Sequence, residues 1–225
     1  MKHPIRVAVI KLIWGQIVFA ALIFFAAGTW AYWQGWLFLA VFAALNTSSI
    51  VYLAMRDKPL LERRLAAGPS QEKERPQRVI VSLIRLTFYA SIILSALDHR
   101  FDLSPVPGYV SVIGNVITAL SFLATYWVIK ANSWAAANVS VAEDQRVIDT
   151  GPYAHLRHPM YAFSIWIYVG IPLALGSWWT IALIVLAIPV LIWRLLDEER
   201  ILQLDLPGYA EYMTKVPYHL IPYVW

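Results

Sequence analysis

Six long apolar runs, joined by shorter polar links, make up most of the chain. They cover about Leu12–Gly28, Trp33–Met55, Val79–Leu97, Tyr109–Ile129, Met160–Leu175 and Trp178–Trp193. A helix that crosses a membrane needs about 20 mostly apolar residues. The pattern therefore predicts an all-α integral membrane protein with about six transmembrane helices. No strand-like alternation and no GxGxxG motif is present, which excludes a Rossmann-type cofactor domain.

The links join the apolar runs into hairpins. A short turn at Gly28 and Thr29 connects the first two runs, and Gly176 with Ser177 connects the last two. We expect each pair to form an antiparallel helical hairpin. On this basis residues 1–130 are predicted to be a four-helix membrane scaffold, and residues 131–225 a core that carries the chemistry.

Basic residues indicate which side of the membrane each link faces. The longest polar stretch, Arg56–Arg78, contains seven Lys and Arg residues, whereas the links on the opposite side contain Arg100 alone. Cytoplasmic loops carry an excess of Lys and Arg. The sequence therefore predicts that both termini and the Arg56–Arg78 stretch are cytoplasmic.

Composition agrees with this interpretation and excludes several classes of function. Of 225 residues, 60% are hydrophobic and 14% are charged, against about 25% charged in a soluble domain. The net charge of +4 does not indicate nucleic-acid binding, because the basic residues lie in the links rather than on one face. Cysteine is absent, which excludes disulfides, thiolate nucleophiles and Cys-ligated zinc or iron–sulfur sites.

Candidate chemistry is concentrated in two stretches that flank the last hairpin. The first, residues 151–161, reads GPYAHLRHPMY, and the second, residues 194–200, reads RLLDEER. Both are predicted on the cytoplasmic side, so they can meet in space. Arg194 and Glu198 share a helical face at i, i+4 spacing, while Glu199 is turned about 100° away. A pocket between the stretches would suit a polar ligand beside a lipid-soluble one.

Structural explanations of the same residues remain open at this point. Gly151 and Pro159 are typical of a turn and a helix start. Arg157 and Arg194 are also typical of long basic side chains that reach the membrane surface. His158 could suggest a metal site, but the chain contains only five His residues. We therefore predict no metal.

The two stretches resemble the isoprenylcysteine carboxyl methyltransferase family, and related phospholipid methyltransferases look similar in the same region. The resemblance rests on GPY followed by RHPMY, a helical hairpin, an R-x-x-x-E-E pattern and a tail reading LPGYAEYMTKVPYHLIP. It covers about Asn132 to Pro222. It implies that S-adenosylmethionine binds at the cytoplasmic end of the last two spans.

The resemblance also implies roles for individual residues. The implied cofactor-binding residues are Gly151, Tyr153, His158, Pro159, Tyr161, Glu198 and Glu199; the catalytic candidates are Arg194 and Arg157; and the acceptor-side residues are Asn132, Phe163 and Arg194, with Ser133 beside them. Many members have a small residue where this chain has Phe163. That departure predicts a narrower acceptor tunnel or a different acceptor.

The predicted function is a membrane methyltransferase that uses S-adenosylmethionine on a carboxylate or other polar head of a lipophilic acceptor. Its expected partners are this acceptor and membrane lipids, without nucleic acid. The likeness of the Asn132–Trp225 segment to bacterial-looking members favours the bacterial inner (plasma) membrane over the endoplasmic reticulum. One alternative is a sterol-type reductase that shares the core and uses NADPH. Another is a non-enzymatic transporter or assembly protein.

Overall fold

The computed structural model describes residues 3–72, 74–134, 141 and 144–225. Its α-helices are α1 (Pro4–Ala27), α2 (Trp33–Arg56), α3 (Lys58–Ala66), α4 (Arg75–Phe101), α5 (Gly108–Ala131), α6 (Pro159–Ala174), α7 (Ile184–Asp205) and α8 (Tyr209–Lys215). Short 3-10 helices occupy Pro69–Gln71 (η1), Gly151–Ala154 (η2) and Trp179–Leu183 (η3). Over these residues the chain forms helices and no extended strand, which confirms the predicted fold class.

The predicted spans correspond to helices of the structure. Five helical segments among the described residues are long and apolar enough to cross a membrane: α1, α2, α4, α5 and the continuous run Trp179–Asp205. The remaining apolar helix, α6, has 16 residues, fewer than the about 20 that a full crossing needs. The six predicted runs are therefore six apolar helices, of which one is short.

Two features differ from the sequence-based boundaries. Helix α7 continues from the apolar run through RLLDEER to Asp205, because Leu, Glu and Arg are strong helix formers even where the sequence becomes polar. The long polar stretch also contains α3. The side chain of Asp57 accepts a hydrogen bond from the backbone nitrogen of Leu60, which caps the start of that helix.

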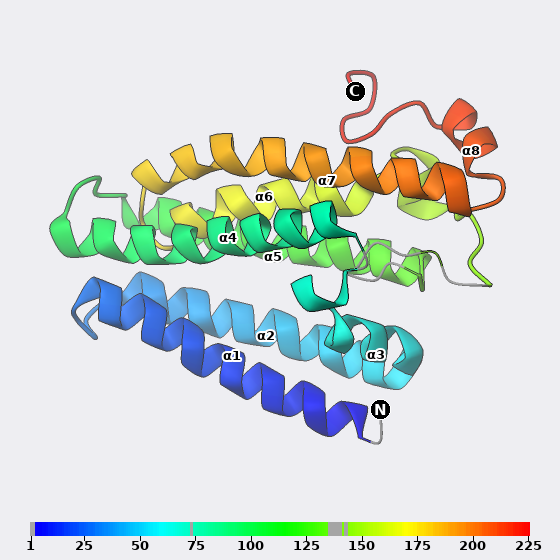
Figure 1. Ribbon diagram of the computed structural model, residues 1–225. Coiled ribbons are helices and arrows are strands. Elements are labelled where there is room, and N and C mark those ends of the chain that lie inside the picture. Colours follow the sequence, from blue (N-terminus) through cyan, green and yellow to red (C-terminus); the bar gives the residue numbers. More distant parts are fainter. Residues whose placement is uncertain (1–2, 73, 135–140, 142–143) are drawn as a thin grey trace.

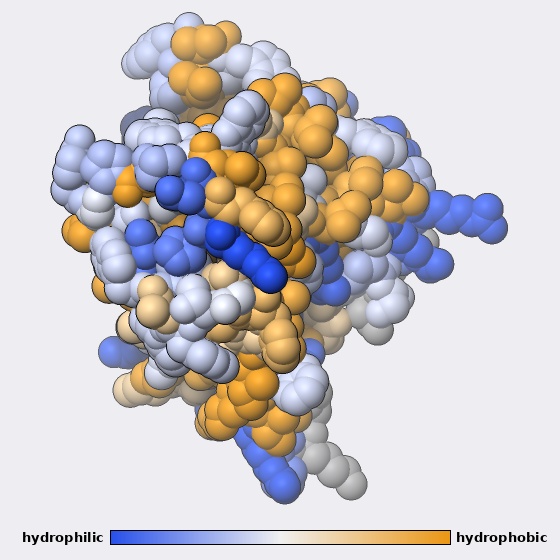
Figure 2. All heavy atoms as spheres, turned by 90° about the vertical axis from the view of Figure 1, so that its left-hand side faces the viewer, coloured by the Kyte–Doolittle hydropathy of each residue, from blue (hydrophilic) through white to orange (hydrophobic). Residues whose placement is uncertain are grey.

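The helices pack side by side in two groups (Figure 1). Helices α1 and α2 form one group, and α4 to α7 form the other. A buried cluster that includes Phe24, Phe38, Ile92 and Ile171 joins the groups. Both ends of the chain lie at the end of the bundle that carries α3 and α8. Figure 2 views the opposite end, where hydrophilic and hydrophobic side chains are interspersed.

Helices α5 and α6 approach each other unusually closely. A Cβ atom on Gly114 would lie 2.2 Å from the backbone nitrogen of Ala174, and one on Gly170 would lie 2.4 Å from Oγ1 of Thr118. Glycine is therefore required at both positions for the backbones to touch. This contact holds the end of α6 against the first half of α5, at the end of the helix pair away from the RHPMY motif.

Candidate functional site

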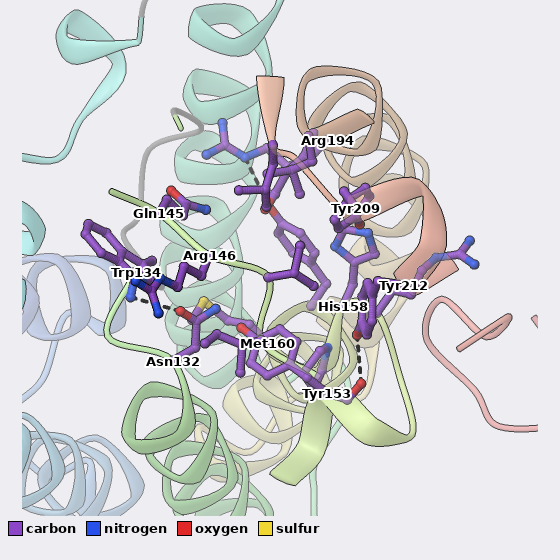
Figure 3. Close-up of a pocket in the computed structure, with 18 residues that line it drawn as sticks. Asn132, Trp134, Gln145, Arg146, Tyr153, His158, Met160, Arg194, Tyr209 and Tyr212 are labelled. Atoms are coloured by element: carbon purple, nitrogen blue, oxygen red, sulfur yellow. Dashed lines mark hydrogen bonds between the residues drawn. The ribbon is translucent and has the colours of Figure 1, made fainter. Parts of the chain in front are cut away.

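A cavity of about 100 Å³ lies where α5 and α7 end and where α6 and α8 begin. It is lined by Asn132, Trp134, Gln145, Arg146, Val147, Ile148, Tyr153, Arg157, His158, Pro159, Met160, Tyr161, Arg194, Glu198, Leu202, Leu206, Tyr209 and Tyr212. Figure 3 shows the labelled side chains converging from separate parts of the chain. Most of the site residues proposed from the sequence are therefore brought together around one cavity.

Three of the sequence-predicted residues do not line this cavity: Gly151, Phe163 and Glu199. Gly151 has a φ of +62° and begins η2, and a Cβ there would lie 3.3 Å from the side chain of Ala131. It allows the GPY segment to turn tightly against the end of α5. Phe163 is half-buried in α6. The backbone oxygen of Ser133, also outside the lining, accepts a hydrogen bond of 2.6 Å from Arg63.

Glu199 lies in a buried network beside the cavity. Its Oε1 accepts a hydrogen bond of 2.6 Å from Nε of Arg157 and lies 3.0 Å from Nε2 of His158. Arg157 also donates from Nη1 to the backbone oxygens of Val216 and Pro217, each at 3.1 Å. These contacts use most of the hydrogen-bonding capacity of both side chains. They tie α7 to the RHP motif and to the C-terminal tail.

The C-terminal tail is held against the RHP motif by its backbone as well. The backbone nitrogen of Arg157 donates to the oxygen of Tyr218 at 2.9 Å, and that of His158 to the oxygen of His219 at 3.1 Å. The Nη2 group of Arg157 also contacts Nε2 of His219. The same nitrogen lies 3.2 Å from Oε2 of Glu199, so His219 contacts both members of the Arg157–Glu199 pair. Burial lowers the pKa of His219, and the negative charge of Glu199 opposes this shift.

Glu198 faces the cavity and belongs to a second chain of contacts. It accepts a hydrogen bond from the hydroxyl of Tyr161, and that hydroxyl accepts one of 3.2 Å from Nε of Arg194. The Nη1 group of Arg194 forms an ion pair of 2.9 Å with Glu72, and it also contacts Gln77. Arg194 is buried and paired rather than exposed at a membrane surface.

The contacts of Glu72 and Gln77 were not predicted from the sequence. These contacts are made with a polar face of α7. Its residues Arg194, Asp197 and Arg200 recur every third position. Gln77 donates to Asp197, and Arg200 forms an ion pair of 2.6 Å with Glu74. The start of α4 and the link before it therefore pack on one face of α7, while Glu198 remains on the cavity face.

Two tyrosines of α8 also contribute to the cavity and were missed by the sequence analysis. The hydroxyl of Tyr212 donates to the backbone oxygen of Tyr153 at 2.7 Å. The hydroxyl of Tyr209 is buried and has no hydrogen-bond partner within the part of the chain that the structure describes. The one sequence feature that indicated them is the LPGYAEY segment. It places two tyrosines three residues apart, and therefore on one side of a short helix.

The phenols of the site are held in their neutral form. Burial raises the pKa of Tyr153 to about 12; the charge of Glu198 adds to the rise, and a hydrogen bond with Asn132 opposes it. Burial also raises the pKa of Tyr209, and the charges of Glu199 and Glu198 act in the same direction. Both hydroxyls are therefore available as hydrogen-bond donors at neutral pH.

The helices that build the cavity can be compared with known proteins. Residues 106–204 match the phospholipid methyltransferase family. The match covers α5, α6 and most of α7, including both motif stretches, and ends just before α8. It confirms the family resemblance that the motifs predicted, and it indicates a membrane methyltransferase. No individual curated protein matches the chain.

Proposed function

We propose that this chain transfers a methyl group from S-adenosylmethionine to the polar head of a lipophilic acceptor. The observation that carries the proposal is the cavity at the end of the helices matched by the family. It combines a carboxylate, aromatic rings and one buried hydroxyl without a partner among the described residues. The predicted orientation would open this cavity to the cytoplasm. A bacterial inner membrane is the location we propose.

The residues present fit the chemistry of this cofactor. Glu198 offers carboxylate oxygens to amino or ribose hydroxyl groups, and its charge suits a sulfonium cation. Trp134 and Tyr153 offer aromatic faces to an adenine ring or a cation. The hydroxyl of Tyr209 offers a donor that is costly to bury unless a ligand accepts from it. Glu199, by contrast, is occupied by its contacts with protein groups.

S-adenosylmethionine, when bound, supplies a methyl group that is already activated by positive charge on sulfur. The protein then has to align the acceptor, exclude water and hold the acceptor in the correct protonation state. Arg194 and Tyr161 are adjacent to Glu198 and can orient an anionic acceptor group. A carboxylate acceptor needs no base. For an amine acceptor, Glu198 is the cavity-facing candidate base, since His158 is directed at Glu199.

Arg157 is better suited to positioning than to catalysis. Its donors reach Glu199, the tail carbonyl groups and His219. We propose that it holds the tail and α7 in place beneath the cavity. Residues 131–225 remain our proposed chemical core, with the first 130 residues as scaffold. The scaffold nevertheless reaches the core, because Glu72 pairs with Arg194.

The test is calorimetric titration of the detergent-solubilised protein with S-adenosylhomocysteine, the demethylated cofactor. Loss of a hydrogen bond to a charged group costs about 1.5–3 kcal/mol, so Glu198→Gln should weaken binding by roughly 10- to 150-fold. Tyr209→Phe should weaken it about fivefold, for a neutral hydrogen bond of about 1 kcal/mol. Glu211→Gln and Tyr218→Phe, outside the cavity lining, are the matched controls.

NADPH is the competing ligand in the same titration. Binding of NADPH in preference to S-adenosylhomocysteine would support the reductase alternative. Absence of binding by either ligand would support a non-enzymatic protein. Transfer of tritium from labelled S-adenosylmethionine to a lipid extract then identifies the acceptor class.

A further inference from the structure

A second cavity of about 370 Å³ lies between α2, α3 and α5. Its walls on α2 run from Leu45 to Leu53, and those on α5 from Phe122 to Ile129. At a rise of about 1.5 Å per residue, the α2 wall is about 12 Å long. That length is close to the depth of one leaflet, which is half of the about 30 Å hydrocarbon core. In the predicted orientation, the cavity lies within the cytoplasmic leaflet.

The cavity walls are apolar with polar side chains interspersed. Leu45, Phe122 and Leu123 provide apolar surface, while Asn46 and Thr125 bring polar groups into membrane helices. Asn46 and Thr125 donate to backbone oxygens of their own helices, at 2.8 and 2.9 Å. Neither of these two bonds links α2 to α5. Polar side chains within a membrane are costly and are usually retained for function.

One end of the cavity is basic. Arg64 of α3 is the one charged residue among the described residues that line the cavity. Lys11 of α1 adds charge nearby, because its Nζ donates to the backbone oxygen of Leu65, another lining residue, at 2.5 Å. A cavity with a cationic end and apolar walls is complementary to an amphiphile with an anionic head. In a leaflet, that description fits a phospholipid.

The second cavity is close to the first. Met160 lines the first cavity and packs against a buried cluster that includes Leu53, Leu61 and Ile129, which line the second. Helix α3 also contacts both regions, because Arg63 lies 5.2 Å from the ring centroid of Trp134. A flexible methionine therefore stands between the two spaces.

We propose that the α2–α3–α5 cavity binds a phospholipid of the cytoplasmic leaflet. Its phosphate lies at Arg64 and one acyl chain packs along Phe122 and Leu45. This inference goes beyond the proposed function, because it would hold for a protein with any chemistry in the first cavity.

The test is native mass spectrometry of delipidated protein titrated with phosphatidylglycerol, with diacylglycerol as the lipid that lacks a phosphate. The Ser49→Phe variant fills the cavity from α2. Val51→Phe is the matched control, since Val51 is half exposed and lies outside the lining. Thr125→Phe fills the cavity from the α5 wall and replaces Ser49→Phe if that variant does not fold. Arg64→Gln removes the charge.

Wild-type protein and Val51→Phe should retain one phosphatidylglycerol molecule, and the filled variants should bind it at least about tenfold more weakly. Arg64→Gln should reduce the preference for phosphatidylglycerol over diacylglycerol about fivefold. Equal retention by Ser49→Phe and Val51→Phe, or no preference for the phosphate in wild type, would overturn the proposal. S-adenosylhomocysteine binding is measured on the same samples. Filling the second cavity should change the affinity for S-adenosylhomocysteine less than twofold. Failure of the lipid proposal can therefore be distinguished from failure of the proposed function.

Discussion

The two adjacent glutamates of α7 should respond differently to the same substitution. Glu199 is buried against Arg157 and His158, whereas Glu198 faces the cavity. Glu199→Gln removes the charge that compensates a buried guanidinium. Glu198→Gln removes a charge whose protein partner, the hydroxyl of Tyr161, can still donate to an amide oxygen. The first substitution should act on stability and the second on ligand binding.

The burial of the ion pair sets the size of the effect. The side chains of Arg157 and Glu199 are each 6% exposed. Removing one partner of a buried pair costs about 3–5 kcal/mol. The carbonyl partners of Arg157 remain, so we expect the lower end, about 3 kcal/mol. A chain of this size loses about 2–4 °C in its thermal unfolding midpoint per kcal/mol of stability, so Glu199→Gln should lower that midpoint by roughly 6–12 °C. Glu198→Gln should lower it by less than about 4 °C.

The assay is thermal unfolding in detergent followed by intrinsic fluorescence, at one scan rate because membrane proteins often unfold irreversibly. Titration with S-adenosylhomocysteine accompanies it. Retention of the wild-type midpoint by Glu199→Gln together with loss of ligand binding would refute the reasoning, because Glu199 would then be a ligand residue. Equal destabilisation by both variants would also refute it.

Two further comparisons use matched positions, and a third prediction concerns pH. Glu72→Gln, at a buried ion pair, should lower stability by about 3 kcal/mol and speed proteolysis between α3 and α4, whereas Glu74→Gln, at an exposed pair, should leave both unchanged. Gly114→Ala should cost about 1–3 kcal/mol by overpacking, and Gly15→Ala, with open space around it, should not lower the unfolding midpoint. The unfolded state binds the His219 proton more tightly than the folded state, because the folded pKa is lowered from 6.5. The free energy of unfolding should therefore decline as pH falls below that value, and His219→Gln should flatten the decline measured between pH 7.5 and 5.5.

The apolar helices were predictable because membrane insertion imposes a length and a composition that can be read locally. Trp33 was correctly predicted as the start of α2, and the predicted Met160 start of α6 differs by one residue. The polar ends of helices carry no such signal. Helix α7 extends to Asp205 because its sequence favours helix after the apolar run has ended. Hydropathy alone therefore set its end too early.

Most of the proposed cavity residues could be found because they lie in two short motifs. Tyr153, His158 and Tyr161 are neighbours in sequence, so a turn and one helix start suffice to bring them together. The partners of Arg194 follow a different rule. Glu72 is more than 100 residues away in the sequence. Its link contains several charged residues, and the sequence pattern does not distinguish which of them pairs with Arg194. Only the packing of that link on α7 determines the partner.

The selection of Glu72 changes what Arg194 can do for an acceptor. An anionic head that approaches Arg194 meets a guanidinium that already has a carboxylate partner in the buried ion pair. To use Nη1, the acceptor must displace Glu72 or share its partner. The Nε group is engaged as well, because it donates to the hydroxyl of Tyr161, which in turn donates to Glu198 beside the cavity. If an anionic acceptor binds at Arg194, its binding would therefore be linked to the position of Glu72 in the link before α4.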